Sequence, residues 1–215
     1  MRETRGRGGR GAVSGGGCLF AVMISLALAT APGGRHLIDR VLAVVDGALI
    51  TQSDVEAAMR LGLVSPRNGA DPVAGVLEGL IERRLILAEV DRYAPPDPAE
   101  PDIDGAFEAV RARLGAESFA NVLVQTGGSP DQVRRFVRDD LRIAAYLQQR
   151  FGTIQPSELD VAQYYREHAD QFGGRSLQDA RDAVAAQLTA ERRTSLVADW
   201  VASLRRRANT NILPR

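Results

Sequence analysis

The sequence predicts a mainly α-helical protein with one small β-sheet that joins an N-terminal hairpin to a C-terminal strand. Residues 176–207 are typical of one helix of about 30 residues, and Asp46-Gly47 between two apolar runs favours a hairpin over residues 37–51. Residues 209–213 alternate between polar and apolar like a strand. An isolated hairpin is barely stable in water, and this tail is the only later segment with the right alternation. We therefore expect the two ends of the mature chain to meet in one sheet.

The long helix predicted at residues 176–207 begins with a Ser-x-x-acid cap at Ser176 and ends on three arginines, which suit the negative end of a helix dipole. At about 100° per residue, its apolar residues change face midway. The first group is Leu177, Val184 and Leu188, and the second, nearly opposite, is Leu196, Val197, Trp200, Val201 and Leu204. The two halves should therefore pack against different neighbours, unless a kink near Arg192-Arg193 turns the second half.

Three helices are predicted between the hairpin and residue 115. Ser53-Asp54-Val55-Glu56 matches a capping box and starts the first, which is followed by a loop over residues 62–71. The second covers residues 72–93 and is ended by a proline-rich segment at residues 94–98, which cannot continue a helix. The third is amphipathic, ends at Gly115, and carries its apolar residues at helical spacing: Ile103, Phe107, Val110 and Leu114.

Three more helices are predicted before the long one, which makes seven in all. A short helix with Phe119, Val122 and Leu123 ends at Gly127-Gly128. Ser129-Pro130-Asp131-Gln132 is the strongest helix start in the chain, and the helix it opens runs to Phe151. Another helix starts at Pro156-Ser157, carries an apolar face to Phe172, and ends at Gly173-Gly174.

The first 29 residues are typical of a secretory signal peptide. A basic segment with four arginines precedes an apolar run, Leu19–Leu28, and small-x-small sites follow at Ala29 and Ala31. Cleavage is expected after Ala29, because Pro32 would make the second scissile bond an imide. The apolar run is shorter than the roughly 20 residues needed to span a bilayer, which disfavours an uncleaved anchor and stable membrane insertion.

Composition excludes several classes of function. The chain is 45% hydrophobic and 25% charged, which is enough apolar residues for an ordinary core. Its one cysteine, Cys18, leaves with the signal peptide, so the mature chain has no disulfide, cysteine metal site or cysteine nucleophile. The mature chain keeps 23 arginines against 26 acidic residues, a net charge of −3, which makes nucleic acid a poor partner.

Three segments together resemble one family, the SurA family of periplasmic chaperones and peptidyl-prolyl isomerases. Residues 38–55 resemble the opening of the family's N-terminal domain, residues 80–87 its second helix, and residues 128–172 the stretch that leads to its isomerase domain. In the family a parvulin domain of about a hundred residues follows at this point. Here Gly173-Gly174 passes directly into the long C-terminal helix, so the isomerase module is expected to be absent.

The resemblance implies a signal peptide at residues 1–29 and a SurA N-terminal-like helical chaperone domain at residues 30–172. Residues 173–215, a long helix and a strand, are expected to complete the same domain. The implied function is an ATP-independent periplasmic chaperone, a holdase, that binds unfolded outer-membrane or secreted proteins. Two alternatives stay open, namely a peptidyl-prolyl cis-trans isomerase of the SurA/parvulin family and a dedicated non-catalytic assembly subunit.

Client segments need apolar surface that they can reach, and the predicted client-binding residues are those that lie off the core stripes: Leu61, Leu63 and Val124. No catalytic, cofactor-binding or metal-ligating residue is predicted. Parvulin-type isomerisation needs histidines with an acid or thiol beside the prolyl bond, whereas the chain has only His36 and His168, and His168 is expected to be a solvated helix residue.

Three further groups are given structural interpretations. Asp139-Asp140 cannot face one another on a helix, and we expect them to form salt bridges with nearby arginines rather than a catalytic pair. The basic run Arg134–Arg142 is interspersed with acids and has no aromatic stacking platform, so a solvated face is favoured over nucleic-acid binding. Trp200, Tyr164 and Tyr165 lie in apolar stripes and are interpreted as core residues rather than a ligand cage.

Overall fold

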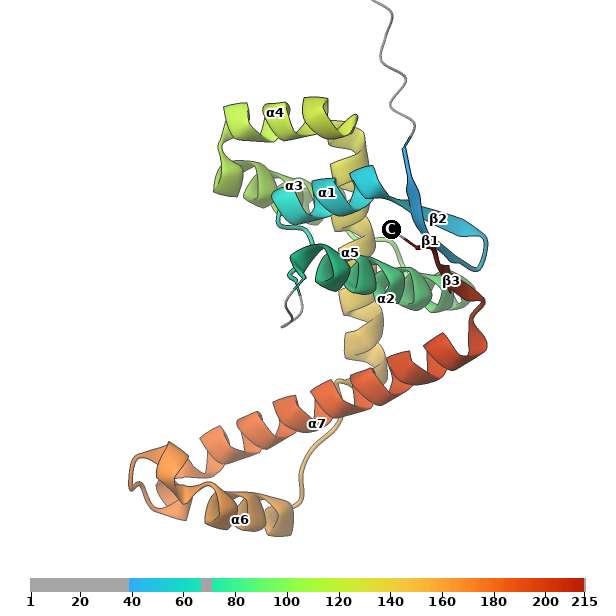
Figure 1. Cartoon of the computed structure of the whole chain (residues 1–215). Coiled ribbons are helices and arrows are strands. Elements are labelled where there is room, and N and C mark those ends of the chain that lie inside the picture. Colours follow the sequence, from blue (N-terminus) through green and yellow to red (C-terminus); the bar gives the residue numbers. More distant parts are fainter. Residues whose placement is uncertain (1–38, 67–70, 215) are drawn as a thin grey trace, which may run out of the picture. The chain divides into compact units, whose positions relative to one another are not determined.

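A computed structural model describes residues 39–66 and 71–214 (Figure 1). The predicted signal peptide, His36 and the middle of the 62–71 loop lie outside these residues. In chain order the elements are β1 (Val41–Val45), β2 (Ala48–Thr51), α1 (Gln52–Arg60), α2 (Pro72–Tyr93), α3 (Glu100–Leu114), α4 (Ala116–Thr126), α5 (Pro130–Phe151), α6 (Glu158–Glu167), a short 3-10 helix η1 (Ala169–Phe172), α7 (Leu177–Arg207) and β3 (Thr210–Ile212). The mainly α-helical class with one small sheet is confirmed for the described part of the chain.

The two ends of the described chain meet in one antiparallel sheet, as predicted, with the strand order β2-β1-β3 (Figure 1). Asp46 and Gly47 between β1 and β2 have φ angles of 48° and 84°, and a two-residue hairpin turn of this type requires positive φ at both positions. The same turn contacts the C-terminal segment. The Asp46 amide donates to the Asn209 carbonyl at 3.0 Å, and the Asn209 amide donates to Asp46 Oδ1 at 2.9 Å.

The start of α1 differs from the prediction. The capping box is formed by Thr51 and Asp54 rather than by Ser53 and Glu56: the Asp54 amide donates to Thr51 Oγ1 and the Thr51 amide donates to Asp54 Oδ2. Because β2 runs directly into α1, Thr51 still has the extended backbone that an N-cap requires. Ser53 instead donates its hydroxyl to the Asp39 carboxylate, which ties the helix to the segment before β1.

Three clusters of buried side chains hold the described fold together. The sheet cluster joins β1, β2, α1, α2 and the end of α7: Leu42, Ala43, Val45, Ile50, Val55, Ala58, Val76, Leu77, Ile81, Leu85 and Leu204. The α3–α5 cluster joins three helices and the end of α1: Leu61, Ile103, Val110, Phe119, Val122, Leu123, Val133 and Val137. The α6–α7 cluster is separate from both: Val161, Tyr164, Phe172, Ala180, Val184 and Leu188.

Helix α7 runs without a break from Leu177 to Arg207 and takes part in two of these clusters (Figure 1). Its first half packs against α6 through Val184 and Leu188, and its second half packs against α2 through Leu204. Two different neighbours therefore explain why the apolar stripe changes face. Between the two packed ends, Leu196 is 43% exposed, although the sequence pattern placed it in the second stripe.

The end of α6 also differs from the prediction. The helix stops at Glu167 instead of running to Phe172, and η1 follows. His168 is the residue at the break; it is half-buried, its Nδ1 lies 3.0 Å from the Tyr164 carbonyl oxygen, and its ring stacks on Tyr164 at 4.1 Å between centroids. The expectation of a solvated helix residue is therefore wrong, because the ring finds an aromatic partner one turn earlier.

Packing of α6 on α7 should weaken in acid because of Asp160. Arg192 on α7 donates to this carboxylate at 2.8 and 3.0 Å and, together with the Ser157 hydroxyl, holds the Asp160 pKa well below its ordinary value. The folded pKa is lower than the unfolded one, so the stabilisation is present above the ordinary aspartate pKa of about 3.9 and is lost as the pH falls below it. The protection factors of α6 amides, which are exchange rates corrected for the intrinsic effect of pH, should therefore fall below about pH 4.

In the Asp160→Asn variant, α6 amides should exchange faster at neutral pH, and their exchange should depend less on acid. Asp199→Asn, at an exposed aspartate on the same helix α7, is the matched control and should keep the wild-type pH dependence. An Asp160→Asn profile that follows wild type at every pH would contradict the assignment.

Candidate functional site

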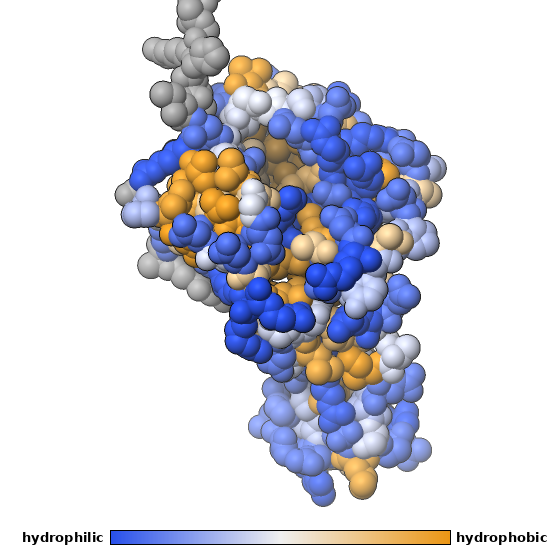
Figure 2. All heavy atoms as spheres, turned by 90° about the vertical axis from the view of Figure 1, so that its right-hand side faces the viewer, coloured by the Kyte–Doolittle hydropathy of each residue, from blue (hydrophilic) through white to orange (hydrophobic). Residues whose placement is uncertain are grey.

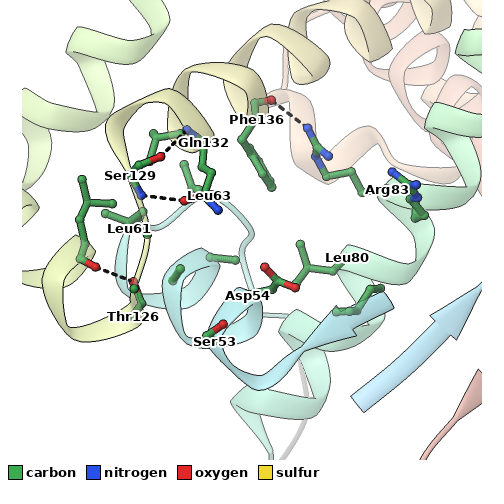
Figure 3. Close-up of a pocket in the computed structure, with 18 residues that line it drawn as sticks. Ser53, Asp54, Leu61, Leu63, Leu80, Arg83, Thr126, Ser129, Gln132 and Phe136 are labelled. Atoms are coloured by element: carbon green, nitrogen blue, oxygen red, sulfur yellow. Dashed lines mark hydrogen bonds between the residues drawn. The ribbon is translucent and has the colours of Figure 1, made fainter. Parts of the chain in front are cut away.

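On the face seen in Figure 2, hydrophobic side chains reach the surface in separate patches, some of them around a hollow. The main candidate site is a pocket of about 320 Å³ between α1, α2, α5 and the turn that joins α4 to α5 (Figure 3). Its apolar wall includes Leu61, Leu63, Leu80, Leu123, Val133 and Phe136. Its polar rim includes Ser53, Asp54, Arg84, Thr126, Ser129 and Gln132.

The segment after α1 places two leucines in this wall. Leu61 is the C-cap of α1 and packs inward on the α3–α5 cluster, whereas Leu63 is half-buried between that cluster and the sheet cluster. Arg113 of α3 holds the turn in place by donating to the carbonyls of Leu61 at 2.7 Å and Gly62 at 3.0 Å. Leu63 therefore stays at the wall although it belongs to no helix.

Arg83 of α2 fixes the opposite wall. Its Nη2 donates to the Phe136 carbonyl at 2.8 Å, and its guanidinium lies 3.7 Å from the centre of the Phe136 ring. Its Nε also donates to Asp140 Oδ1 at 2.9 Å. A planar guanidinium can stack and donate at the same time, so one side chain locks α2 to α5 and orients the ring that closes the pocket.

The salt bridges predicted for Asp139 and Asp140 are present, but their main partner is on another helix. Arg83 of α2 pairs with both carboxylates, and Arg142 on α5 pairs with Asp139. The pair is only partly exposed, and burial raises the pKa of the Asp140 carboxyl in spite of the opposing effect of Arg83. The two aspartates therefore join α2 to α5 and do not form a solvated helix face.

Polar groups at the rim are largely engaged within the protein. The Ser129 amide donates to Gln132 Oε1 at 2.7 Å and the Gln132 amide donates to Ser129 Oγ at 3.3 Å, which is the capping box of α5 (Figure 3). Thr126 donates its hydroxyl to the Val122 carbonyl at 2.9 Å. Asp54 caps α1. Apart from the exposed Arg84, the rim groups are therefore satisfied within the protein, and the pocket offers mainly apolar contact to a ligand.

Of the three residues predicted to bind clients, Leu61 and Leu63 line the pocket and Val124 does not. Leu61 is 1% exposed, so the expectation that it lies off the core is wrong; as the C-cap residue that follows α1 it packs with residues of α3, α4 and α5. Leu63 lines the pocket, while Val124 is 82% exposed on α4 and is not part of the pocket. Sequence reasoning missed Leu80 and Phe136 as pocket residues, because both occupy positions of an apolar helix stripe and only the packing of α2 against α5 leaves space between them.

The aromatic and basic residues singled out in the sequence do not form a further site with one another. The centroid of the Trp200 ring lies 5.9 Å from that of Tyr146 and 5.7 Å from that of Phe151, whereas Tyr164 belongs to the α6–α7 cluster. Arg134 pairs with Glu100 and Asp104. Tyr164 and Trp200 are thus packing residues, and Arg134 has the acidic partners that the sequence pattern predicted.

In residues 39–66 and 71–214, no three or more His, Cys, Asp or Glu side chains come together in a way that could hold a metal ion. Within the same residues, no helix combines the length and the apolar character that crossing a bilayer requires. No protein-family model matches the chain, and no curated protein matches it.

Proposed function

We propose that this protein is an ATP-independent chaperone of the periplasm that holds unfolded outer-membrane or secreted proteins by their apolar segments. The observation that carries the proposal is the pocket between α1, α2 and α5, whose wall is apolar and whose rim groups, apart from the exposed Arg84, are hydrogen-bonded within the protein. The resemblance of residues 38–55, 80–87 and 128–172 to the SurA family and the export signal expected at residues 1–29 support it.

The size of the pocket suits transient holding. About 320 Å³ is at the lower end of the range for ligand pockets, so it accommodates one or two side chains of a client. Burying one leucine side chain contributes roughly 1.5–3 kcal/mol, whereas micromolar affinity requires about 8 kcal/mol. A client must therefore make several such contacts, and each one can be released without an energy source.

The proposal is tested by aggregation of an unfolded outer-membrane β-barrel protein in the absence of ATP. The purified protein should suppress aggregation, and Leu63→Gln should weaken suppression about tenfold, because a polar amide replaces apolar pocket wall. Leu159→Gln is the matched control, since Leu159 is 82% exposed on α6 and outside the pocket. Equal unfolding free energies of the variants would show that the effect is on binding.

Two results would overturn the proposal. The first is no suppression at several-fold molar excess of the purified protein. The second is full activity of Leu63→Gln together with loss of activity in Val124→Gln, which would move the client site from the pocket to α4. We also propose that the protein is not an isomerase, so it should leave the rate of a proline-limited refolding phase unchanged.

A further inference from the structure

A second pocket, of about 420 Å³, lies at the other end of α5 and shares no residue with the first. It is bounded by the end of α2, the proline segment that follows α2, and the last turns of α5. The residues that matter to its chemistry are Tyr93, Pro95, Pro96, Tyr146 and Arg150. Its volume is within the range of sites that bind small ligands or peptide side chains.

The apolar side of this second pocket is a row of aromatic rings. Tyr93 is 60% exposed and its ring lies 5.7 Å from that of Tyr146, which is 5% exposed. Tyr146 in turn packs on Trp200 of α7 at 5.9 Å. The exposed Tyr93 ring is thus supported by the rings of Tyr146 and Trp200. A ligand can therefore contact Tyr93 without displacing core side chains.

The shape of the second pocket depends on the end of α2. Ala94 has a φ of 43°, a left-handed conformation that a residue with a Cβ seldom adopts, and its amide donates to the Val90 carbonyl at 2.9 Å. This turn ends α2 and leads at once into Pro95 and Pro96, which line the same pocket as Tyr93. Proline rings and an exposed tyrosine ring together make a surface that suits apolar or prolyl side chains in an extended chain.

The polar side of the second pocket is Arg150. Its guanidinium lies 5.4 Å from the Trp200 ring and 5.6 Å from the Phe151 ring, and its Nη1 is 3.4 Å from the Tyr146 hydroxyl. In the described part of the chain no carboxylate lies within ion-pair distance of Arg150. Two other arginines on α2 and α5 have acidic partners that offset their charge: Arg92 pairs with Glu89, and Arg142 pairs with Asp91. Arg150 therefore leaves the second pocket with a positive charge.

We propose that the second pocket binds an acidic extended segment of another polypeptide. A side-chain carboxylate of that segment pairs with Arg150, and a neighbouring proline or aliphatic side chain rests on Tyr93 and the two prolines. Guanidinium–carboxylate pairs provide both charge and two parallel hydrogen bonds, which selects a carboxylate over a neutral amide. This site does not depend on the proposed chaperone activity, because the two pockets have no residue in common.

The sole tryptophan of the chain gives a direct readout, because Trp200 is in ring contact with Tyr146 and lies beside Arg150. The probe is a short peptide, acetylated and amidated at its ends, in which glutamate alternates with proline and leucine. Its binding should change Trp200 emission saturably, and calorimetry should give the same affinity. Added salt should weaken binding, since the carboxylate meets an exposed cation. The same peptide with glutamine in place of glutamate should bind about tenfold more weakly.

Variants locate the site. Arg150→Gln should lower the affinity for the glutamate peptide about tenfold, Arg150→Lys should lower it less because the charge remains, and Tyr93→Ala should also lower it. Arg166→Gln, which removes the same charge from an exposed position on α6, is the matched control and should bind like wild type. Circular dichroism confirms that each variant is folded.

The proposal is overturned if calorimetry detects no binding of the glutamate peptide, if the glutamine peptide binds equally well, or if Arg150→Gln and Arg166→Gln behave alike. Because Leu63→Gln leaves the second pocket intact, it should bind the peptide normally. Failure of the chaperone assay and failure of peptide binding are therefore separate results.

Discussion

Replacement of Leu204 by alanine is expected to lower the free energy of unfolding by about 2–5 kcal/mol, the usual cost of removing a large buried aliphatic side chain. Leu204 is 5% exposed and is the member of the sheet cluster contributed by α7, where it packs with residues of β1, β2, α1 and α2. The cavity left by the truncation would lie where the C-terminal helix joins the N-terminal hairpin. Urea denaturation of the purified variant measures the loss.

The control for this prediction is on the same helix. Leu196→Ala removes the same atoms at a position that is 43% exposed, and it should cost less than about 1 kcal/mol. Both variants should keep the wild-type dependence of unfolding free energy on urea, since neither changes the surface exposed on unfolding by much. Similar midpoints for Leu204→Ala and Leu196→Ala would mean that the end of α7 contributes little to the sheet cluster.

Val184→Asp is expected to unfold α6 and the first half of α7 while the sheet and the α3–α5 cluster stay folded. Val184 is fully buried in the α6–α7 cluster, and an unpaired carboxylate there would cost several kcal/mol. That cluster has only six buried members, none of which belongs to the other two clusters. Hydrogen exchange should therefore lose protection in α6 and early α7 and keep it in β1 and α2.

Ala186→Asp is the matched substitution, because Ala186 is exposed two residues further along the same helix. It should cost only the difference in helix propensity, about 0.7 kcal/mol or less, and leave all protection in place. If Val184→Asp also removed protection from the sheet, the α6–α7 cluster and the sheet cluster would form one cooperative unit, and the separation argued from packing would be wrong.

Elements that depend on local signals were predictable from the sequence. The bounds of α2, Pro72–Tyr93, follow from a helix start and a proline stop, and the Asp46-Gly47 turn follows from its need for positive φ. The pairing of β3 with β1 could be inferred because the hairpin needs a third strand and only one later segment alternates. The periodicity of apolar residues in α7 showed that its buried face changes midway, but it did not show which helices pack against each half.

Features that depend on competition between nearby groups were not predictable in detail. Ser53 lost the capping position to Thr51, because the strand continues to the helix without a linker. His168 lies just after the end of α6, and its ring stacks on Tyr164. Leu61 borders the 62–71 loop and was predicted to lie off the core stripe, but it is buried in the core. The pocket depends on the separation between α2 and α5 where they pack, and no single stretch of sequence determines that separation.

The pairing of Asp46 with Asn209 joins positions 163 residues apart, and the strand that completes the sheet, β3, is the last element within the described residues. Closing a loop of that length costs roughly 4–5 kcal/mol of chain entropy. As the chain is synthesised from its N-terminus, β1 therefore keeps one edge unpaired until β3 has been made. The three-stranded sheet therefore cannot close before β3 is available, and contacts of such long sequence separation are those that slow folding most.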